Sequence, residues 1–328
     1  MTDWRYRLAQ QRGTLTALAI FLVMFTIYVS NHPAGFTPNV VQTAANKGVL
    51  LALVAMAQTF VVVTAGIDLS VGMIFILASC VASYVVVGSP WQSATGVALV
   101  ILTGLACGLV NGLIVVFGRL QPIVVTIATG ATYFGLALWL RPNPGSTPEF
   151  NSDLADAFTG KLLGLYPASL VALAVLVLVV WIPWRRSVVG RAAYAVGSSE
   201  VAAYMSGVPI RRARLVAYIL SGAFASIGGL FLTFFTYSGE ASLANGNTYT
   251  LFSIAAVVLG GVSLFGGSGS AIGAIFGALA FRTIGDLLFV FDLDPLWQPL
   301  FQGVVLVLAV SLGAARLFQV RNRLDLFN

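Results

Sequence analysis

Long apolar stretches with almost no charge recur along this chain from one end to the other. Of its 328 residues, 59% are hydrophobic and 9% are charged, whereas about a quarter of an ordinary globular domain is charged. A helix needs about 20 mostly apolar residues to cross a bilayer, and continuous apolar runs favour helices over a barrel. We therefore predict an all-α, polytopic transmembrane helical bundle of about ten spans: 14–30, 45–64, 70–88, 92–117, 122–140, 168–184, 213–236, 249–263, 269–290 and 297–315. The 34 glycines predict close helix packing.

The composition also excludes several classes of protein. So few charges cannot cover the surface of a soluble enzyme, and the net charge of +6 has no polar face on which to bind nucleic acid. Cys80 and Cys107 lie in apolar runs and the lone histidine, His32, lies in a short polar stretch. We therefore expect no disulfide framework, no metal site and no catalytic residue.

The basic residues indicate the orientation of the chain in the membrane. With the N-terminus placed in the cytoplasm, 13 of the 17 lysines and arginines fall on the cytoplasmic side: Arg5, Arg7, Arg12, Arg119, Arg185, Arg186, Arg191, Arg211, Arg212, Arg214, Arg316, Arg321 and Arg323. Cytoplasmic loops are enriched in Lys and Arg. We therefore expect both termini in the cytoplasm, which requires an even number of spans.

Only two segments between spans are long and polar. Residues 141–167 are predicted to face outward, with a short amphipathic stretch at 153–163, and residues 185–213 are predicted to face inward. Neither is suited to a soluble domain of its own, so we predict a single transmembrane domain over residues 1–328. The halves 45–140 and 213–315 each contain one glycine-marked helix break, which suggests an internal repeat.

The chain lacks the residues that would supply energy for transport. A phosphate-binding loop needs Gly-x-x-x-x-Gly-Lys followed by Ser or Thr. Lys161 follows Gly160, but Ala155 stands where the first glycine should be, and Lys47 follows no such loop. We therefore expect no ATP site in this chain. Arg282 and Asp286 are spaced i, i+4 in the ninth span, so we predict that they pair with one another rather than form a proton path.

The segment 64–72, TAGIDLSVG, separates two apolar runs. Gly66 suits the left-handed residue that closes a helix, and Asp68 suits the cap of the next helix. Two interpretations stay open. One is a tight turn at the membrane surface. The other is a helix break that lines a polar path, because irregular backbone at depth is tolerated only beside protein or water.

Two further motifs follow. In the inward segment, Ser198 is predicted to cap a short helix that Gly207 and Pro209 end. Its residues are Ser198, Ser199, Glu200, Val201, Ala202, Ala203, Tyr204, Met205 and Gly207, and its apolar side suits either a docked partner or lipid headgroups. The glycine-rich reversal 259–269 is predicted to be a close-packed turn. The candidate helix-break or pathway residues are Gly66, Asp68, Ser70, Gly72, Gly260, Gly261, Gly266 and Gly267.

Together these motifs resemble the membrane permeases of bacterial ABC importers for ribose, xylose, galactosides and related sugars. The resemblance is carried by GIDLSVG, by AVGSSEVAAYMSGV with the basic cluster after it, by GGVSLFGGSGSAIGAIFGAL and by the outward segment 150–154. It implies a multi-pass protein of the bacterial inner membrane that forms a sugar path with a second, identical or different permease. It also implies a periplasmic sugar-binding protein and a separate cytoplasmic ATPase that binds ATP and Mg²⁺. The helix at 198–206 would then be the coupling helix that enters the ATPase.

Other functions remain open from the sequence. A related ABC permease for branched-chain amino acids carries a similar but different string in place of GIDLSVG. An ion-coupled secondary transporter would need carboxylates within the membrane, for which only Asp286 and Asp68 qualify. A purely structural or channel-like membrane protein is a third class.

Cysteines introduced singly at Ser152 and Ser198 test the predicted topology. Because the arginine distribution places residue 152 outside and residue 198 inside, an impermeant thiol reagent added to intact spheroplasts should label the first variant only. Inverted vesicles should give the reverse pattern. Labelling of both variants from the same side would contradict the topology.

Overall fold

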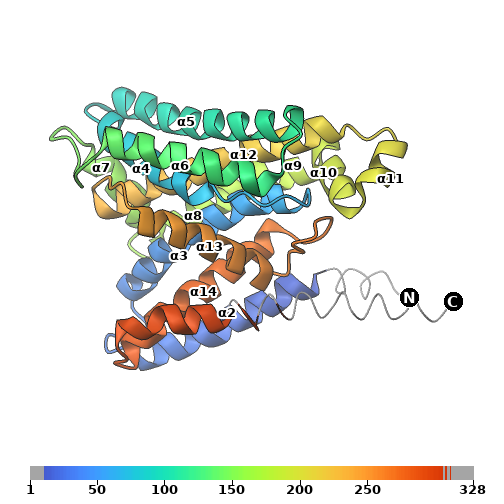
Figure 1. The fold of residues 1–328 in the computed structure, drawn as a ribbon. Helices are drawn as coiled ribbons and strands as arrows, with labels where there is room; N and C mark the ends of the chain where they lie inside the picture. The colour runs from blue at the N-terminus through green and yellow to red at the C-terminus, as the bar shows by residue number, and fades with distance from the viewer. Residues whose placement is uncertain (1–10, 306, 309–310, 312–328) are drawn as a thin grey trace.

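The computed structural model describes residues 11–305, 307, 308 and 311, and it consists mainly of helices (Figure 1). Seven stretches in this part of the chain are long and apolar enough to cross a membrane: α2 (Arg12–Asn31), α3 (Pro38–Val62), α5 (Pro90–Phe117), α6 (Pro122–Leu140), the run Ala168–Arg186, α12 (Ile210–Thr236) and α14 (Ala271–Val290). Two shorter apolar helices are α4 (Val71–Val85) and α13 (Leu243–Leu259). The chain therefore has the fold of an all-α, multi-pass membrane protein.

The remaining elements are short. The run Ala168–Arg186 consists of α8 (Ala168–Leu176), a π-helical turn (Val177–Trp181) and α9 (Ile182–Arg186). Outside the long helices lie α7 (Ser152–Thr159), α10 (Val188–Ser198), α11 (Glu200–Met205) and a 3₁₀ turn (Pro295–Trp297) that leads into a helix at 298–305. The strands β1 (Lys161–Leu162) and β2 (Tyr166–Pro167) form an antiparallel hairpin.

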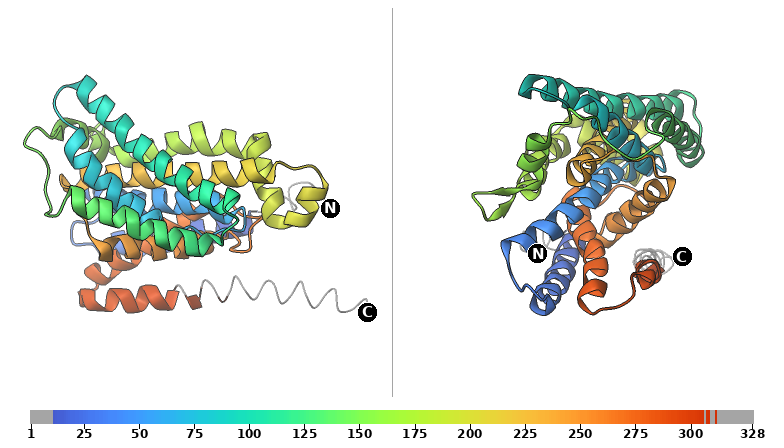
Figure 2. Two further views of the ribbon diagram at one scale, coloured as in Figure 1. Left: turned by 45° about the horizontal axis from the view of Figure 1, so that its top comes forward. Right: turned by 90° about the vertical axis from the view of Figure 1, so that its left-hand side faces the viewer.

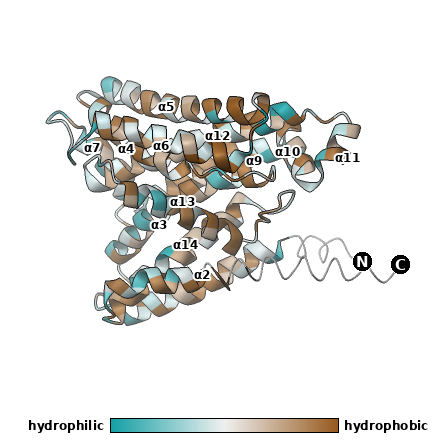
Figure 3. Cartoon of the chain, viewed as in Figure 1, coloured by the Kyte–Doolittle hydropathy of each residue, from teal (hydrophilic) through white to brown (hydrophobic). Residues whose placement is uncertain are grey.

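Helix α3 lies at the centre of the bundle. Nearly all of it is buried, and it contacts α12, α14, α13, α8 and α4. Helix α12 packs against α5 and α4 on one side of α3, and α14 packs against α2 on another (Figures 1 and 2). Brown, apolar residues recur along these helices, with white and teal residues between them (Figure 3). Helix α7 lies at one end of the bundle, and α10 and α11 lie at the opposite end (Figure 1).

Each of the first nine predicted spans corresponds to a helix, and the predicted limits 122–140 agree with those of α6. Helix α3 begins seven residues before its predicted start, because Thr37 caps it by accepting a hydrogen bond from the Val40 N–H. The predicted span 297–315 lies partly outside the described residues. The amphipathic stretch predicted to reach residue 163 ends earlier, at Thr159. Helix α10 was not predicted.

Glycines allow the close helix packing that the composition predicts. A Cβ atom on Gly72 of α4 would lie 1.9 Å from the Gly246 carbonyl oxygen and 2.4 Å from Thr250 Oγ1, both on α13. A Cβ atom on Gly222 of α12 would lie 2.1 Å from the carbonyl oxygen of Gly104 on α5. These helices touch backbone to backbone, so any side chain at these positions would push them apart.

Gly72→Ala should therefore destabilise the bundle, by about 1–3 kcal/mol for overpacking. Gly135→Ala is the matched control, because a Cβ atom on Gly135 of α6 would have no neighbour within 4 Å. In thermal unfolding of the purified protein in detergent, we expect a lower midpoint for the first variant and an unchanged or higher midpoint for the second. Equal midpoints for Gly72→Ala and the wild type would contradict the close contact between α4 and α13.

Candidate functional site

The three sequence motifs meet at one place, the end of α3. The Val63 carbonyl oxygen, just after α3, accepts a hydrogen bond of 3.1 Å from the Gly267 N–H of the glycine-rich reversal. A Cβ atom on Gly197, near the end of α10, would lie 2.0 Å from the same oxygen. The end of α3, just before segment 64–72, is thus in direct contact with the end of α10 and with the glycine-rich reversal 259–269.

The backbone of the break differs in detail from the prediction. Ala65, and not Gly66, takes the left-handed conformation, with φ of 62°. The Gly66 N–H still closes the helix by donating to the Val61 carbonyl oxygen. Ser70, and not Asp68, directly precedes the first turn of α4. The left-handed residue is thus shifted by one position. The residue just before α4 lies two positions after Asp68, and its side chain makes no capping hydrogen bond.

Asp68 nevertheless organises the start of α4. Its carboxylate is fully buried. Oδ1 accepts hydrogen bonds from the Ser70 N–H at 2.9 Å and the Ser70 hydroxyl at 2.6 Å, and Oδ2 accepts one from the Ser221 hydroxyl of α12 at 3.2 Å. Such donors compensate part of the cost of burying a charge. The carboxylate therefore links the break to α12.

The network continues into two further helices. Asn111 Nδ2 of α5 donates to Ser70 Oγ at 2.8 Å, and the Tyr133 hydroxyl of α6 donates to Asn111 Oδ1 at 3.0 Å. Neither residue was predicted from the sequence, and nor was Ser221. Asn111 could have been found, because an asparagine inside a long apolar run usually has a polar partner on a neighbouring helix.

Two more backbone groups of the break are satisfied by side chains. The Leu69 N–H donates to Thr126 Oγ1 of α6 at 2.9 Å, and the Gly72 N–H donates to Thr250 Oγ1 of α13 at 3.1 Å. Neither threonine was predicted, since threonine is common in apolar helices and nothing local distinguishes these two. The break is thus completed by residues far away in the sequence.

The position of Ser221 locates the break along the length of α12. Ser221 is the twelfth residue of the 27-residue helix α12, and it touches Asp68 directly. The carboxylate is therefore level with the middle of a helix that is long enough to cross a membrane. This placement favours a helix break at depth over a tight turn at the membrane surface.

The candidate pathway residues mostly hold backbone segments together. None of the eight is exposed. Gly260 packs against the backbone of Gly273 on α14, and Gly261 packs against Gly13 on α2. Gly266 and Gly267 pack against Ala65 and Ser198. These close contacts fix the shape of the backbone around the break.

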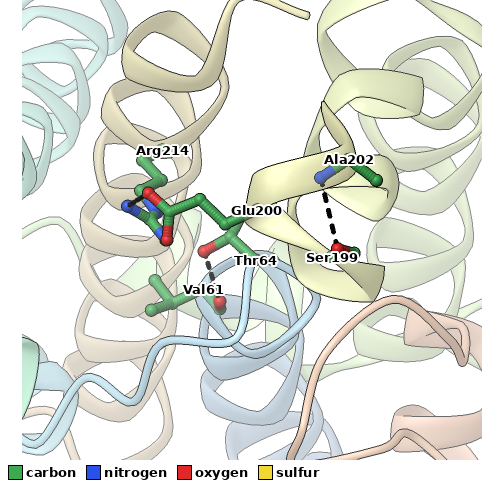
Figure 4. A network of polar contacts seen from close by, with 6 residues as sticks. All are labelled: Val61, Thr64, Ser199, Glu200, Ala202 and Arg214. Carbon is green, nitrogen blue, oxygen red and sulfur yellow. Dashed lines mark hydrogen bonds and ion pairs between the residues drawn. The ribbon is translucent and has the colours of Figure 1, made fainter. Parts of the chain in front are cut away.

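The predicted short inward helix is α11, but its cap is corrected. The Ser199 side chain accepts the hydrogen bond from the Ala202 N–H, at 3.3 Å, whereas Ser198 is the last residue of α10. Glu200 makes a bidentate ion pair with Arg214 of α12, at 2.9 and 2.6 Å. Figure 4 shows this pair beside Thr64, whose hydroxyl donates to the Val61 carbonyl oxygen at the end of α3.

One side of α11 faces away from the protein. Val201, Tyr204 and Met205 are 75%, 74% and 80% exposed, whereas Ala203 is buried against the rest of the chain. Gly207 ends the helix with φ of 70°. Large apolar side chains thus project from a short helix held by a cap and an ion pair.

Helix α10 is fixed to the glycine-rich reversal by Tyr194. Its hydroxyl donates to the Gly269 carbonyl oxygen at 2.8 Å, and burial raises the pKa of Tyr194 to about 12. The hydroxyl therefore stays protonated, and keeps this hydrogen bond, throughout the physiological pH range. Residues 185–213 are consequently anchored at α10 and exposed at α11.

The predicted pair of Arg282 and Asp286 is replaced by another. Asp286 makes an ion pair with Lys47 of α3, at 3.2 Å between Nζ and Oδ1, and Arg282 has no ion pair within the described residues. Helices α3 and α14 pack side by side here, with Gly48 facing Leu279. An arginine four residues before an aspartate is also the weaker of the two orders on a helix. The described residues contain no His, Cys, Asp and Glu cluster that could hold a metal ion.

Replacing Asp68 tests whether its hydrogen bonds or its charge are needed. In Asp68→Asn the amide oxygen can accept from Ser70 and the amide N–H can donate to Ser221, whose hydroxyl also accepts. Asp68→Leu leaves these donors unpartnered, at about 1–3 kcal/mol each. We expect the thermal midpoint of purified Asp68→Asn to stay near that of the wild type and that of Asp68→Leu to fall clearly. If both variants fall equally, the negative charge itself stabilises the break.

Known proteins resemble this chain over most of its length. Residues 40–310 match the family described as the permease component of the branched-chain amino acid transport system. A probable ABC transporter permease protein of Sinorhizobium fredii is 33% identical and covers 90% of this chain and 88% of its own. The ribose import permease proteins of Bacillus subtilis and Escherichia coli K12 are 30% and 32% identical. They too cover 90% of this chain, and 90% and 91% of their own.

No solved structure matches the chain. The family match and these relatives confirm the resemblance to ABC importer permeases. They also confirm that the chain is a permease component and not an enzyme. The chain belongs to the permease-component family of the branched-chain amino acid transport system.

Proposed function

We propose that the chain is the permease subunit of an ATP-driven importer and forms the membrane path for a monosaccharide. The observation that carries this proposal is the match, over about 90% of both chains, to proteins named as ribose import permeases. A D-allose transport system permease is 29% identical over 92% of this chain, and a fructose import permease is 32% identical over 80%. The match to permeases for several sugars supports the substrate class without selecting one sugar.

The proposed energy source is a separate cytoplasmic ATPase that binds ATP and Mg²⁺, with α11 as the coupling helix. Isolated helices shorter than about 12 residues are marginal in water, and α11 has six. Its exposed Val201, Tyr204 and Met205 therefore need a covering surface. An apolar cleft of an ATPase would bury them, and Ser199 and the ion pair from Glu200 to Arg214 would hold the helix ready to dock.

The proposed outer partner is a periplasmic sugar-binding protein. At the end of the bundle opposite α11, a cavity lies between the start of α5 and the outward segment, and residues 149–154 are among its lining. This segment contains the outward stretch that resembles the permease family. It supports a docking region on the proposed periplasmic side.

The remaining assignments rest on the arginine distribution and on family resemblance. We propose an inner-membrane protein that spans the bilayer about ten times, with both termini in the cytoplasm and residues 1–328 in one domain. Its path would lie between this chain and a second permease, identical or different. The buried network around Asp68 would support the helix break next to that path. We propose no nucleic-acid partner.

Two alternative functions can be weighed against particular observations. The family description names branched-chain amino acids, which favours an amino-acid permease. An ion-coupled transporter would need a carboxylate that is free to bind protons or sodium. Asp286 is paired with Lys47 and Asp68 accepts three hydrogen bonds, so neither carboxylate favours this second class.

Ala202→Glu tests the coupling helix. Ala202 is exposed in this chain, so the variant should fold, but burying an unpaired charge in a docked interface costs roughly 3–5 kcal/mol. We expect the ATPase to be lost from the complex purified through this chain, and sugar uptake to be lost with it. Ala203→Glu is the poorer choice, because Ala203 is buried within the chain itself.

Ala157→Glu is the matched control for ATPase binding alone. It makes the same change at an exposed position of α7, at the other end of the bundle, where Ala157 lines the outer cavity described above. It should keep the ATPase. Retention of the ATPase by Ala202→Glu as well would leave α11 as a helix lying on the membrane surface.

A further inference from the structure

A basic cavity lies where the run Ala168–Arg186 leaves the bundle. It has a volume of about 480 Å³ and is lined by Trp181, Ile182, Arg185, Arg186, Arg191 and Ile272. Ile272 belongs to the first turn of α14, so the cavity lies between two helix ends and the start of α10. It is separate from the Asp68 network and from α11.

The cavity gathers positive charge that the chain does not neutralise. The side chains of Arg185, Arg186 and Arg191 are exposed. Within the described residues, none of the three has a hydrogen bond or an ion pair, and Arg185 only approaches the ring of Tyr194, at 5.8 Å. Arginine side chains recognise phosphate through their forked N–H groups. The cavity is therefore suited to a phosphate-bearing anion.

One of the residues that line the cavity also carries a neutral donor. Trp181 is fully buried, and its indole N–H has no acceptor in the part of the chain that the structure describes. A buried indole N–H usually has a hydrogen-bond partner. Trp181 is the last residue of the π-helical turn, in which the Ile182 N–H donates to the Val177 carbonyl oxygen, and Pro183 follows. Such turns recur at functional sites.

An apolar stripe leads from the cavity toward the membrane interior. Spacings of three to four residues put exposed apolar side chains on one side of α8 and the π-helical turn: Val171, Val175, Leu178 and Val179. The stripe reaches the cavity at Ile182. A soluble anion would use only the arginines, whereas a phospholipid would place its phosphate on them and its acyl chains on the stripe.

We propose that this cavity binds the phosphate group of an anionic phospholipid from the cytoplasmic leaflet. The inference rests on the orientation proposed above, in which the end of the run Ala168–Arg186 faces the cytoplasm. Basic pockets between transmembrane helices on that side bind anionic headgroups. Arg185, Arg186 and Arg191 hold the phosphate, and the acyl chains lie along α8.

Lipid binding can be measured apart from transport. The full chain, purified in an uncharged detergent, is titrated with phosphatidylglycerol or with phosphatidylcholine of the same acyl chains, and native mass spectrometry counts the bound lipids. We expect the wild type to prefer phosphatidylglycerol. Arg186→Gln combined with Arg191→Gln should weaken that binding about thirtyfold, since each arginine near an anionic surface contributes roughly a factor of five.

The control is Arg211→Gln combined with Arg212→Gln, which removes the same charge from exposed positions at the start of α12. It should bind phosphatidylglycerol as the wild type does. No lipid preference in the wild type, or equal losses in the two double variants, would overturn the proposal. The wild-type comparison does not depend on whether a variant folds.

Two other ligands give distinct results. Displacement of phosphatidylglycerol by inorganic phosphate at equal concentration would identify a soluble-anion site and overturn the lipid assignment. If the cavity variant keeps phosphatidylglycerol but loses the co-purified ATPase, the arginines contact protein and the proposal is wrong. Failure of lipid binding alone leaves the importer function untouched, because that function rests on other residues.

Discussion

The helix break after α3 depends on the buried carboxylate of Asp68 and its donors. In a lipid environment each unsatisfied backbone group costs several kcal/mol, so the chain can leave a helix at depth only where other groups replace the lost hydrogen bonds. Asp68, Thr126 and Thr250 accept the N–H groups of Ser70, Leu69 and Gly72. These acceptors come from the break itself, α6 and α13. The break is therefore a product of the assembled bundle as well as of its local sequence.

The same break is connected to the end of the bundle where α10 and α11 lie (Figure 1). The Val63 carbonyl oxygen binds the Gly267 N–H, and Gly197 is packed against that oxygen. Helix α11 begins three residues after Gly197, which lies near the end of α10, and its Glu200 is paired with Arg214 of α12. Backbone contacts with no intervening side chain transmit displacement with little loss, because close-packed interiors are stiff. A partner that moved α11 would act on the end of α3, and through it on the Asp68 network.

The sequence predicted the helices well because hydrophobic length is set by the bilayer and can be read locally. It also predicted that segments 64–72, 198–207 and 259–269 are breaks or short helices, since glycine, proline and serine mark such places. It missed what depends on partners from elsewhere in the chain. Asp286 pairs with Lys47 because α3 packs beside α14, and Ser199 caps α11 because α10 extends through Ser198. No local spacing contains that information.

Residues 185–213 carry two different kinds of surface within a short stretch of chain. Residues 185–191 present three arginines beside an apolar stripe, which suits an anionic membrane surface, whereas Val201, Tyr204 and Met205 project from α11 and suit an apolar cleft. Between them, Tyr194 ties α10 to Gly269. Because one side of α10 is buried, at Ala192, Ala193 and Val196, this helix would hold the proposed lipid-binding and ATPase-binding surfaces at a fixed separation. A helix in this position would keep α11 clear of the headgroups, where a soluble ATPase can reach it.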